Sequence, residues 1–138
     1  MLEIQHGSTE DREYIREQLI GFNKTKVPLA VQHETEQICF LLKEGGEIKG
    51  GLTGEYSWNH VHVSFLWLDE SVKGGGYGSK LLSMVEAYAN ERACSKVILD
   101  TFSFQAPGFY EKNGYVEYGR LDDHPVEGMT QYFYKKLL

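Results

Sequence analysis

A run of glycines in the middle of the chain separates an apolar stretch from an amphipathic one. The segment VKGGGYGSKLL holds Gly74, Gly75, Gly76 and Gly78 within five positions. An ordered glycine costs conformational entropy, roughly 0.5–1 kcal/mol relative to alanine inside a helix or strand. The run therefore indicates a specific demand on the backbone: a tight turn, a left-handed dihedral angle, or close approach by a ligand.

The segments on both sides of the glycines predict a βαβ unit. Residues 61–68 (VHVSFLWL) begin with alternation and end apolar at every position, as in a strand buried on both faces. The helix that follows the glycines carries Tyr77, Leu81, Val85, Tyr88 and Ala89 at helical spacing. A second buried strand, KVILDT at 96–101, comes next. Strand, helix and strand in this order predict a right-handed crossover between two parallel strands.

The remainder of the chain predicts further strands and helices. The stretch 38–58 reads as two strands joined by a turn at Glu44–Glu47, where two glycines supply positive φ. Ser8 is a candidate N-cap for a helix with apolar residues from Tyr14 to Phe22. The other expected elements are a first strand at 2–5, a short second helix within 23–37, a short helix within 105–115, and strands at 115–119 and 129–138.

Composition and net charge limit the class of protein to which the chain can belong and the kinds of partner that it can bind. The chain has 138 residues, 41% hydrophobic and 25% charged, which is typical of one globular domain. No apolar run approaches the roughly 20 residues of a membrane span, and the N-terminal residues lack the pattern of a signal peptide, so we expect a cytoplasmic protein without a membrane partner. A net charge of −6 argues against nucleic acid as a partner. Cys39 and Cys94 stand far apart without metal-ligand spacing, so we expect free thiols and no metal.

Three phosphate-binding turns place glycines between a strand and a helix. The P-loop pattern fails here, because counting from Gly74 puts Ser79 where its second glycine belongs. The dinucleotide pattern finds Gly76 but then Ser79, and no clear acidic ribose partner follows. The third is the pyrophosphate loop of the GCN5-related N-acetyltransferase (GNAT) family, Arg/Gln-x-x-Gly-x-Gly/Ala. The stretch from Lys73 to Gly78 resembles it in register, with lysine at the first position.

The resemblance to the GNAT family extends over essentially the whole chain, 1–138, as a single acetyltransferase domain. FLWLDESVKGGGYGSKLL is similar to the family's fourth strand and third helix, and DTFSFQAPGFYEKNGY to its fifth strand and fourth helix. The resemblance implies an α/β (α+β) fold: a mixed central sheet of about six to seven strands with about four helices. Strands four and five would be parallel and splayed around the cofactor. A small bacterial subgroup with unassigned acceptors has a similar DTFSFQA stretch.

Acetyl-CoA is the co-substrate that this resemblance implies. Its pyrophosphate would lie on backbone N–H groups of the glycine turn, and its pantetheine arm would pair with backbone groups of the fourth strand. A β-bulge in that strand would direct an N–H at the thioester oxygen. Ser103 stands where many members carry asparagine. The expected cofactor-binding residues are Leu66, Trp67, Leu68, Lys73, Gly74, Gly75, Gly76, Tyr77, Gly78, Ser79, Ser103 and Tyr110.

The implied reaction is direct attack of a primary amine, on a small molecule or a protein, on the acetyl group. Tyr110 matches the family's usual general acid, and a phenol with an ordinary pKa near 10 is protonated at neutral pH. Glu55 is the first candidate for the general base, and His60, His62 and a water relay are alternatives. The alternative function is a non-catalytic acyl-CoA sensor or regulatory module on the same fold.

The acceptor pocket is expected between the segments 23–37 and 121–128. Acidic side chains on both segments would favour a cationic amine: Asp122, Asp123, Glu127, Glu34 and Glu36. The last strand, 129–138, is long and aromatic, which suggests pairing with a second copy in a homodimer.

Overall fold

The structure is a computed structural model that describes all residues, 1–138. The chain forms two compact units, residues 1–33 and residues 34–138. None of its helices is both long enough and apolar enough to cross a membrane.

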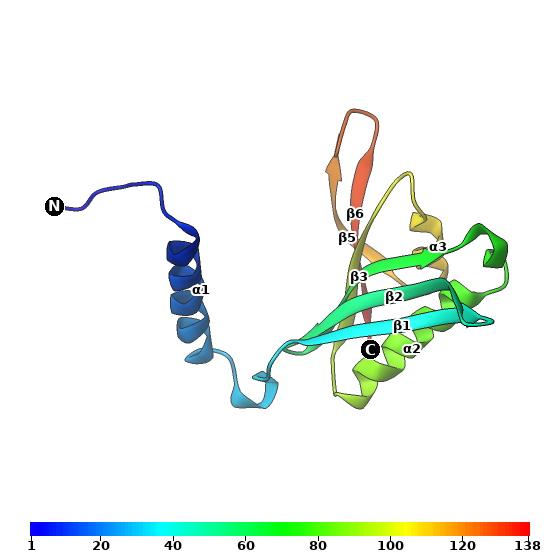
Figure 1. Cartoon of the computed structure of the whole chain (residues 1–138), viewed down its shortest axis with the longest axis horizontal. Helices are drawn as coiled ribbons and strands as arrows, with labels where there is room; N and C mark the ends of the chain where they lie inside the picture. The colour runs from blue at the N-terminus through cyan, green and yellow to red at the C-terminus, as the bar shows by residue number, and fades with distance from the viewer. The chain divides into compact units, whose positions relative to one another are not determined.

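The first unit contains helix α1 (Thr9–Lys24) and a 3₁₀ turn at Leu29–Val31 (Figure 1). Ser8 caps α1 as predicted: its side chain accepts from the Asp11 N–H, and the Asp11 carboxylate accepts from the Ser8 N–H at 2.8 Å. The strand predicted at residues 2–5 was wrong, because these residues form no ladder and an isolated four-residue run has no partner for its backbone groups. The second helix predicted within 23–37 is only the 3₁₀ turn.

The second unit is a six-stranded mixed sheet with two α-helices. The strand order is β1-β2-β3-β4-β6-β5, and only the β3–β4 pair is parallel (Figure 1). The strands are β1 (Glu36–Glu44), β2 (Glu47–Ser57), β3 (His60–Leu68), β4 (Lys96–Phe102), β5 (Val116–Asp122) and β6 (Thr130–Leu137). The helices are α2 (Tyr77–Glu91) and α3 (Pro107–Lys112), with a 3₁₀ turn at Glu70–Val72. This architecture confirms the predicted mixed fold and its βαβ unit.

The connections follow the local chemistry of the sequence. Gly45 and Gly46 adopt φ of 56° and 83° in the turn between β1 and β2, as their type predicts. Strand β6 lies between β4 and β5, so both of its edges are already paired. The expectation that this last strand pairs with a second copy was therefore wrong, and the free edges of the sheet are β1 and β5.

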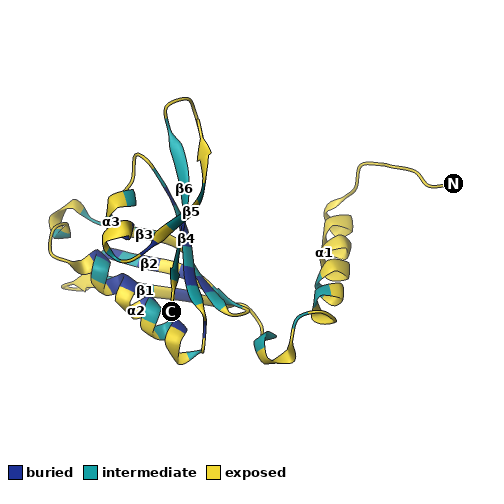
Figure 2. Ribbon diagram, turned by 180° about the vertical axis from the view of Figure 1, so that it is seen from behind, coloured by how far each residue is buried: buried dark blue, intermediate teal, exposed yellow.

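The core lies between α2 and one face of the sheet. Helix α2 packs on β2, β3 and β4, and Leu82, Val85 and Ala89 on its inner side are fully buried. Each aliphatic side chain buried in this way contributes roughly 1.5–3 kcal/mol relative to exposure. In β3, Val61 and Val63 point into this core, and His62 between them, which is half-buried, points to the opposite face. Figure 2 shows buried positions on α2 and on the strands that it covers.

Candidate functional site

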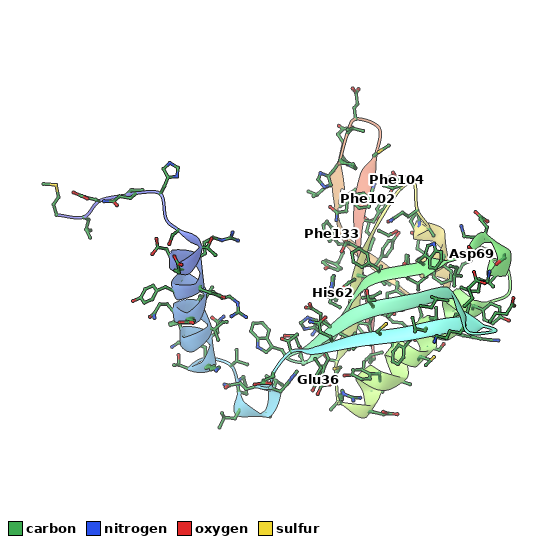
Figure 3. All side chains as sticks on the ribbon, viewed as in Figure 1. Glu36, His62, Asp69, Phe102, Phe104 and Phe133 are labelled. Carbon is green, nitrogen blue, oxygen red and sulfur yellow. The ribbon has the colours of Figure 1, made fainter.

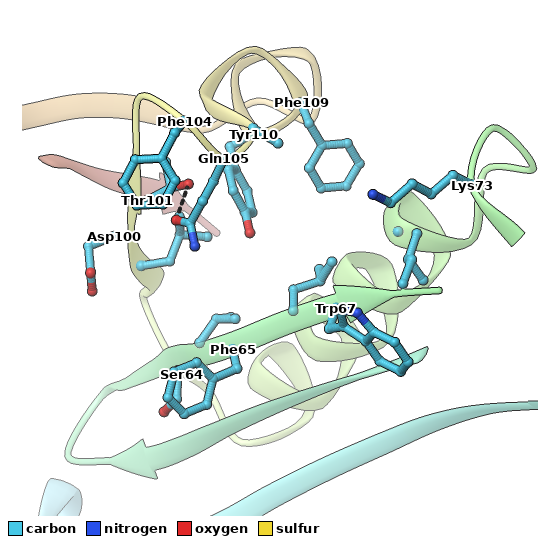
Figure 4. Close-up of a pocket in the computed structure, with 16 residues that line it drawn as sticks. Ser64, Phe65, Trp67, Lys73, Asp100, Thr101, Phe104, Gln105, Phe109 and Tyr110 are labelled. Atoms are coloured by element: carbon cyan, nitrogen blue, oxygen red, sulfur yellow. Dashed lines mark hydrogen bonds between the residues drawn. The ribbon is translucent and has the colours of Figure 1, made fainter. Parts of the chain in front are cut away.

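A cavity opens where the two parallel strands part. The β3–β4 ladder ends at the pair Val63–Leu99, after which β3 continues beside β2 and β4 continues beside β6. The cavity has a volume of about 450 Å³, within the range of small-molecule sites (Figure 4). Its walls are the second half of β3, the end of β4 with the loop that follows it, α3, and the turn before α2.

Strand β3 carries a β-bulge at the mouth of this splay. Thr53 of β2 pairs with Phe65 while the next residue, Gly54, pairs with Val63, so Ser64 is the extra residue. A bulge bends the strand and redirects its backbone groups. The expected bulge is present, slightly earlier in the strand than residues 66–68. The predicted residues Leu66, Trp67 and Leu68 all line the cavity.

The glycine turn joins β3 to α2 through left-handed residues. Gly74 and Gly76 have φ of 85° and 81°, a region that other residues adopt at a cost. Gly76 is the N-cap of α2, and no side chain caps this end of the helix. The N–H groups of the first turn therefore have neither an intrahelical nor a side-chain acceptor, which with the helix dipole makes this end suited to an anion.

The other two glycines allow close packing. A Cβ on Gly75 would lie 2.8 Å from the Tyr77 ring, and one on Gly78 would lie 2.8 Å from Cζ of Phe109 in α3. Gly78 also lines the cavity, whereas Gly74, Gly75, Gly76, Tyr77 and Ser79 do not. The run thus meets two demands: left-handed dihedrals at Gly74 and Gly76, and close contact with rings at Gly75 and Gly78.

Two polar residues predicted to contact the cofactor have different surroundings. Lys73 lines the cavity, and its Nζ lies 3.1 Å from Oε1 of Glu70 in the preceding turn. Ser103 does not line the cavity: its Oγ accepts from the Thr130 N–H at 3.0 Å, and its own N–H donates to the Thr130 carbonyl. Ser103 therefore ties the end of β4 to β6.

Tyr110 of α3 lines the cavity among other aromatic rings. Its ring centroid lies 5.1, 6.1 and 6.3 Å from those of Phe109, Tyr115 and Tyr134. The residue is 8% exposed, and its hydroxyl points into the cavity (Figure 4). Burial, and then the negative charge of Asp100, raise the pKa of Tyr110 above its ordinary value.

The candidate bases lie on the sheet face opposite α2. Glu55 of β2 lies outside the cavity, and its Oε1 accepts from Gln37 Nε2 at 3.2 Å. His60 does not line the cavity either, and burial, followed by the charges of Lys96 and His62, lowers its pKa. His62 also lies just outside the residues that line the cavity. It pairs across the strands with Glu55, and on its other side its Nε2 lies 3.6 Å from Oδ1 of a β4 carboxylate.

That carboxylate is Asp100, which was not among the residues predicted from the sequence. It lines the cavity, and its Oδ2 accepts from Gln131 Nε2 of β6 at 2.9 Å. It could have been found as a lone acidic residue inside the apolar strand KVILDT. A charged side chain is seldom placed in such a strand unless it has a partner or a function.

The predicted acidic walls do not line the cavity. None of the five acids expected there contributes to it: Asp122, Asp123, Glu127, Glu34 and Glu36. Glu36 instead faces α2, where its Oε2 accepts from the Tyr88 hydroxyl at 2.6 Å and lies 3.7 Å from Nε of Arg92.

Known proteins are similar to this chain in sequence and in fold. The model of the Acetyltransferase (GNAT) family matches residues 4–115. Blasticidin-S acetyltransferase of Streptomyces morookaense is 41% identical over 96 residues, which cover 69% of this chain and 70% of that protein.

Two solved structures extend the likeness. The crystal structure of an acetyltransferase from Bacillus cereus ATCC 14579 is 43% identical, with a TM-score of 0.92, and covers 99% of this chain and 98% of that one. An aminoglycoside 6′-N-acetyltransferase complexed with coenzyme A is 18% identical with a TM-score of 0.64, over 74% of this chain and 73% of that one, and shares the fold.

Proposed function

Because the chain belongs to the Acetyltransferase (GNAT) family and is an N-acetyltransferase, we propose that it transfers the acetyl group of acetyl-CoA to an amine of a small molecule. The observation that carries this proposal is the cavity between β3 and β4, which has Lys73 of the glycine turn near one end, Asp100 near the other, and Tyr110 between them (Figure 4).

The chain's own residues fit a long, anionic donor such as acetyl-CoA. The uncapped N-terminus of α2 offers backbone N–H groups to a pyrophosphate, and the left-handed Gly76 leaves the approach free of a side chain. Lys73 adds a positive charge beside that position, and the same ammonium group forms an ion pair with Glu70. The half of β3 beyond the bulge no longer pairs with β4, so its backbone groups on that side can bind the amides of the pantetheine arm.

Tyr110 is the proposed general acid. When the amine attacks the thioester carbon and the C–S bond breaks, the CoA thiolate gains the phenol proton. Burial and the nearby Asp100 hold the pKa of Tyr110 above its ordinary value, so the phenol stays protonated throughout the neutral range. In this proposal the bulge at Ser64, which also lines the cavity, directs a backbone N–H at the thioester oxygen.

The acceptor in this proposal is a cationic amine of antibiotic-like size. Asp100 places a carboxylate in the cavity wall, which favours an ammonium group. By their names, the relatives modify small molecules, blasticidin S in one case and an aminoglycoside amino group in the other.

We further propose that residues 1–138 act as one domain, that the protein works in the cytoplasm, and that it forms a homodimer without strand pairing through β6.

Acetyl transfer tests this proposal directly. The purified protein is mixed with labelled acetyl-CoA and a panel of amines: blasticidin S, aminoglycosides, streptothricin, polyamines, amino acids and basic peptides. We expect saturable binding of acetyl-CoA and acetylation of at least one small amine. Absence of acetyl-CoA binding would refute the donor site, and tight binding without transfer to any amine would indicate an acyl-CoA sensor instead.

A further inference from the structure

An imidazole and a carboxylate lie side by side where β3 and β4 begin to part. His62 of β3 is aligned with Ile98 of β4, and Asp100 follows two residues later. Because side chains alternate along a strand, these three residues lie on the same face of the sheet, opposite α2. The Nε2 of His62 lies 3.6 Å from Oδ1 of Asp100, and Figure 3 shows His62 at this end of the sheet.

The two carboxylate oxygens of Asp100 have different neighbours: Oδ2 is bound by β6, and Oδ1 faces His62. Gln131 donates to Oδ2 at 2.9 Å, which fixes the carboxylate and leaves Oδ1 on the side of His62. The side chains of Asp100 and His62 are 34% and 38% exposed, so a molecule arriving from solvent can reach both. Asp100 also shares the cavity wall with Tyr110.

We propose that Asp100 binds the ammonium group of the acceptor and that His62 takes its proton, which leaves an uncharged amine to attack the acetyl group. This inference rests on the proposed acetyl transfer and assigns the two residues that prepare its nucleophile. An ammonium group cannot attack a carbonyl carbon until it loses a proton, so a base beside its binding site is a chemical requirement of the reaction.

The steps balance in protons and bonds. His62 accepts one proton from the ammonium group, and the amine nitrogen then forms a C–N bond to the acetyl carbon. As the C–S bond breaks, the thiolate takes the Tyr110 proton, and the phenolate takes the second proton from the new amide nitrogen. His62 then releases its proton to solvent, so the products are the N-acetylated acceptor, CoA and one proton.

The charges around His62 suit this role. Glu55 lies opposite it on β2, Asp100 lies beside it on β4, and His60 is its neighbour on the same face of β3. Lys96 of β4 lies nearer to His60, whose pKa it helps to lower. Two carboxylates therefore flank the imidazole that would carry a positive charge after the proton transfer.

The test compares two nucleophiles in the same enzyme. One is the ammonium acceptor of the panel that the wild-type protein acetylates fastest, and the other is hydroxylamine, which is uncharged near neutral pH. We expect His62→Gln to lower kcat/KM for the ammonium acceptor by about 100-fold, and the loss to shrink as rising pH deprotonates the acceptor in solution. Hydroxylamine acetylation, after subtraction of the uncatalysed rate, should be unchanged.

Asp100→Asn separates acceptor binding from donor binding. Because it removes the ionic partner of the ammonium group, we expect KM for the ammonium acceptor to rise by about 10-fold or more, with unchanged affinity for acetyl-CoA. His60→Gln is the matched control, since it removes a neighbouring imidazole on the same face that does not contact Asp100, and it should leave both reactions unchanged.

The outcomes distinguish this inference from the proposed function. If the wild-type protein acetylates neither any amine nor hydroxylamine, the proposed function fails and this inference fails with it. If the wild-type protein is active but His62→Gln slows both nucleophiles equally, or neither, only this inference is overturned. Thermal melting and acetyl-CoA binding verify that each variant is folded, and His62→Asn replaces His62→Gln if the latter does not fold.

Discussion

Gly76→Ala should weaken acetyl-CoA binding by more than its strain alone would suggest. Gly76 has φ of 81°, and a Cβ added there meets no atom within 4 Å. The cost is therefore backbone strain without a clash, about 1–2 kcal/mol for an alanine held in the left-handed region. For a chain of this size, each kcal/mol lowers the melting temperature by roughly 3–4 °C.

The effect of this substitution on acetyl-CoA affinity depends on which part of the backbone moves to relieve the strain. If the turn relaxes toward ordinary dihedrals, the N–H groups at the start of α2 no longer point to one position. Each hydrogen bond to a charged group that is lost costs about 1.5–3 kcal/mol, which corresponds to a 10-fold or larger rise in Kd for acetyl-CoA.

Gly46→Ala is the matched control for this prediction. Gly46 lies in the β1–β2 turn with φ of 83°, and a Cβ there also meets nothing within 4 Å. Thermal melting should show similar destabilisation in both variants, while isothermal titration with acetyl-CoA should show a raised Kd for Gly76→Ala alone. Equal values of Kd in the two variants would refute the assignment of the turn as the pyrophosphate site.

Three further predictions test the catalytic acid and two side-chain contacts of α2. Tyr110→Phe should lower kcat by about 100-fold or more with unchanged Kd for acetyl-CoA, whereas Tyr134→Phe, in the same aromatic cluster but outside the cavity, should retain kcat; equal losses would remove Tyr110 from the mechanism. Lys136→Met should lower the free energy of unfolding in urea by about 2 kcal/mol, because Nζ of Lys136 lies 2.7 Å from Oε1 of the largely buried Glu86; an unchanged urea midpoint would contradict this. Burial, and then the hydrogen bond to a carboxylate, raise the pKa of Tyr88 to about 12, so the folded state keeps this proton longer than the unfolded chain does. The contribution of Tyr88 to the free energy of unfolding should be complete below pH 10 and should be lost as the pH rises to about 12. The Tyr88→Phe variant should therefore lose less stability than the wild type between pH 10 and pH 12, and an equal loss would show that other groups account for it.

The sequence predicts those elements whose signal is local. The apolar residues at 65–68 and the helical spacing from Tyr77 to Ala89 lead to the βαβ unit, and the Gly-Gly pair predicts the first hairpin. Leu2 and Ile4 alternate like strand residues yet form no strand, because a strand also needs a neighbour that local spacing does not supply.

The arrangement of the candidate site depends on register, which local patterns leave open. His62 and Asp100 belong to different strands, and only the parallel alignment of His62 with Ile98 brings them to one face. Ser103 shows the opposite case, because its position in the chain suggests a cofactor contact while its hydroxyl bonds to the backbone of β6. The demands on Gly75 and Gly78 likewise become visible only when the rings they contact are in place.

The central claim is that the splay between β3 and β4 binds the donor of the reaction, and a crystal structure of the protein with CoA tests it most directly. The account predicts the pyrophosphate on the N–H groups at the start of α2, the pantetheine arm along Leu66–Leu68, and the thiol beside Tyr110. A structure with CoA bound elsewhere, and with this cavity free of it, would contradict the account.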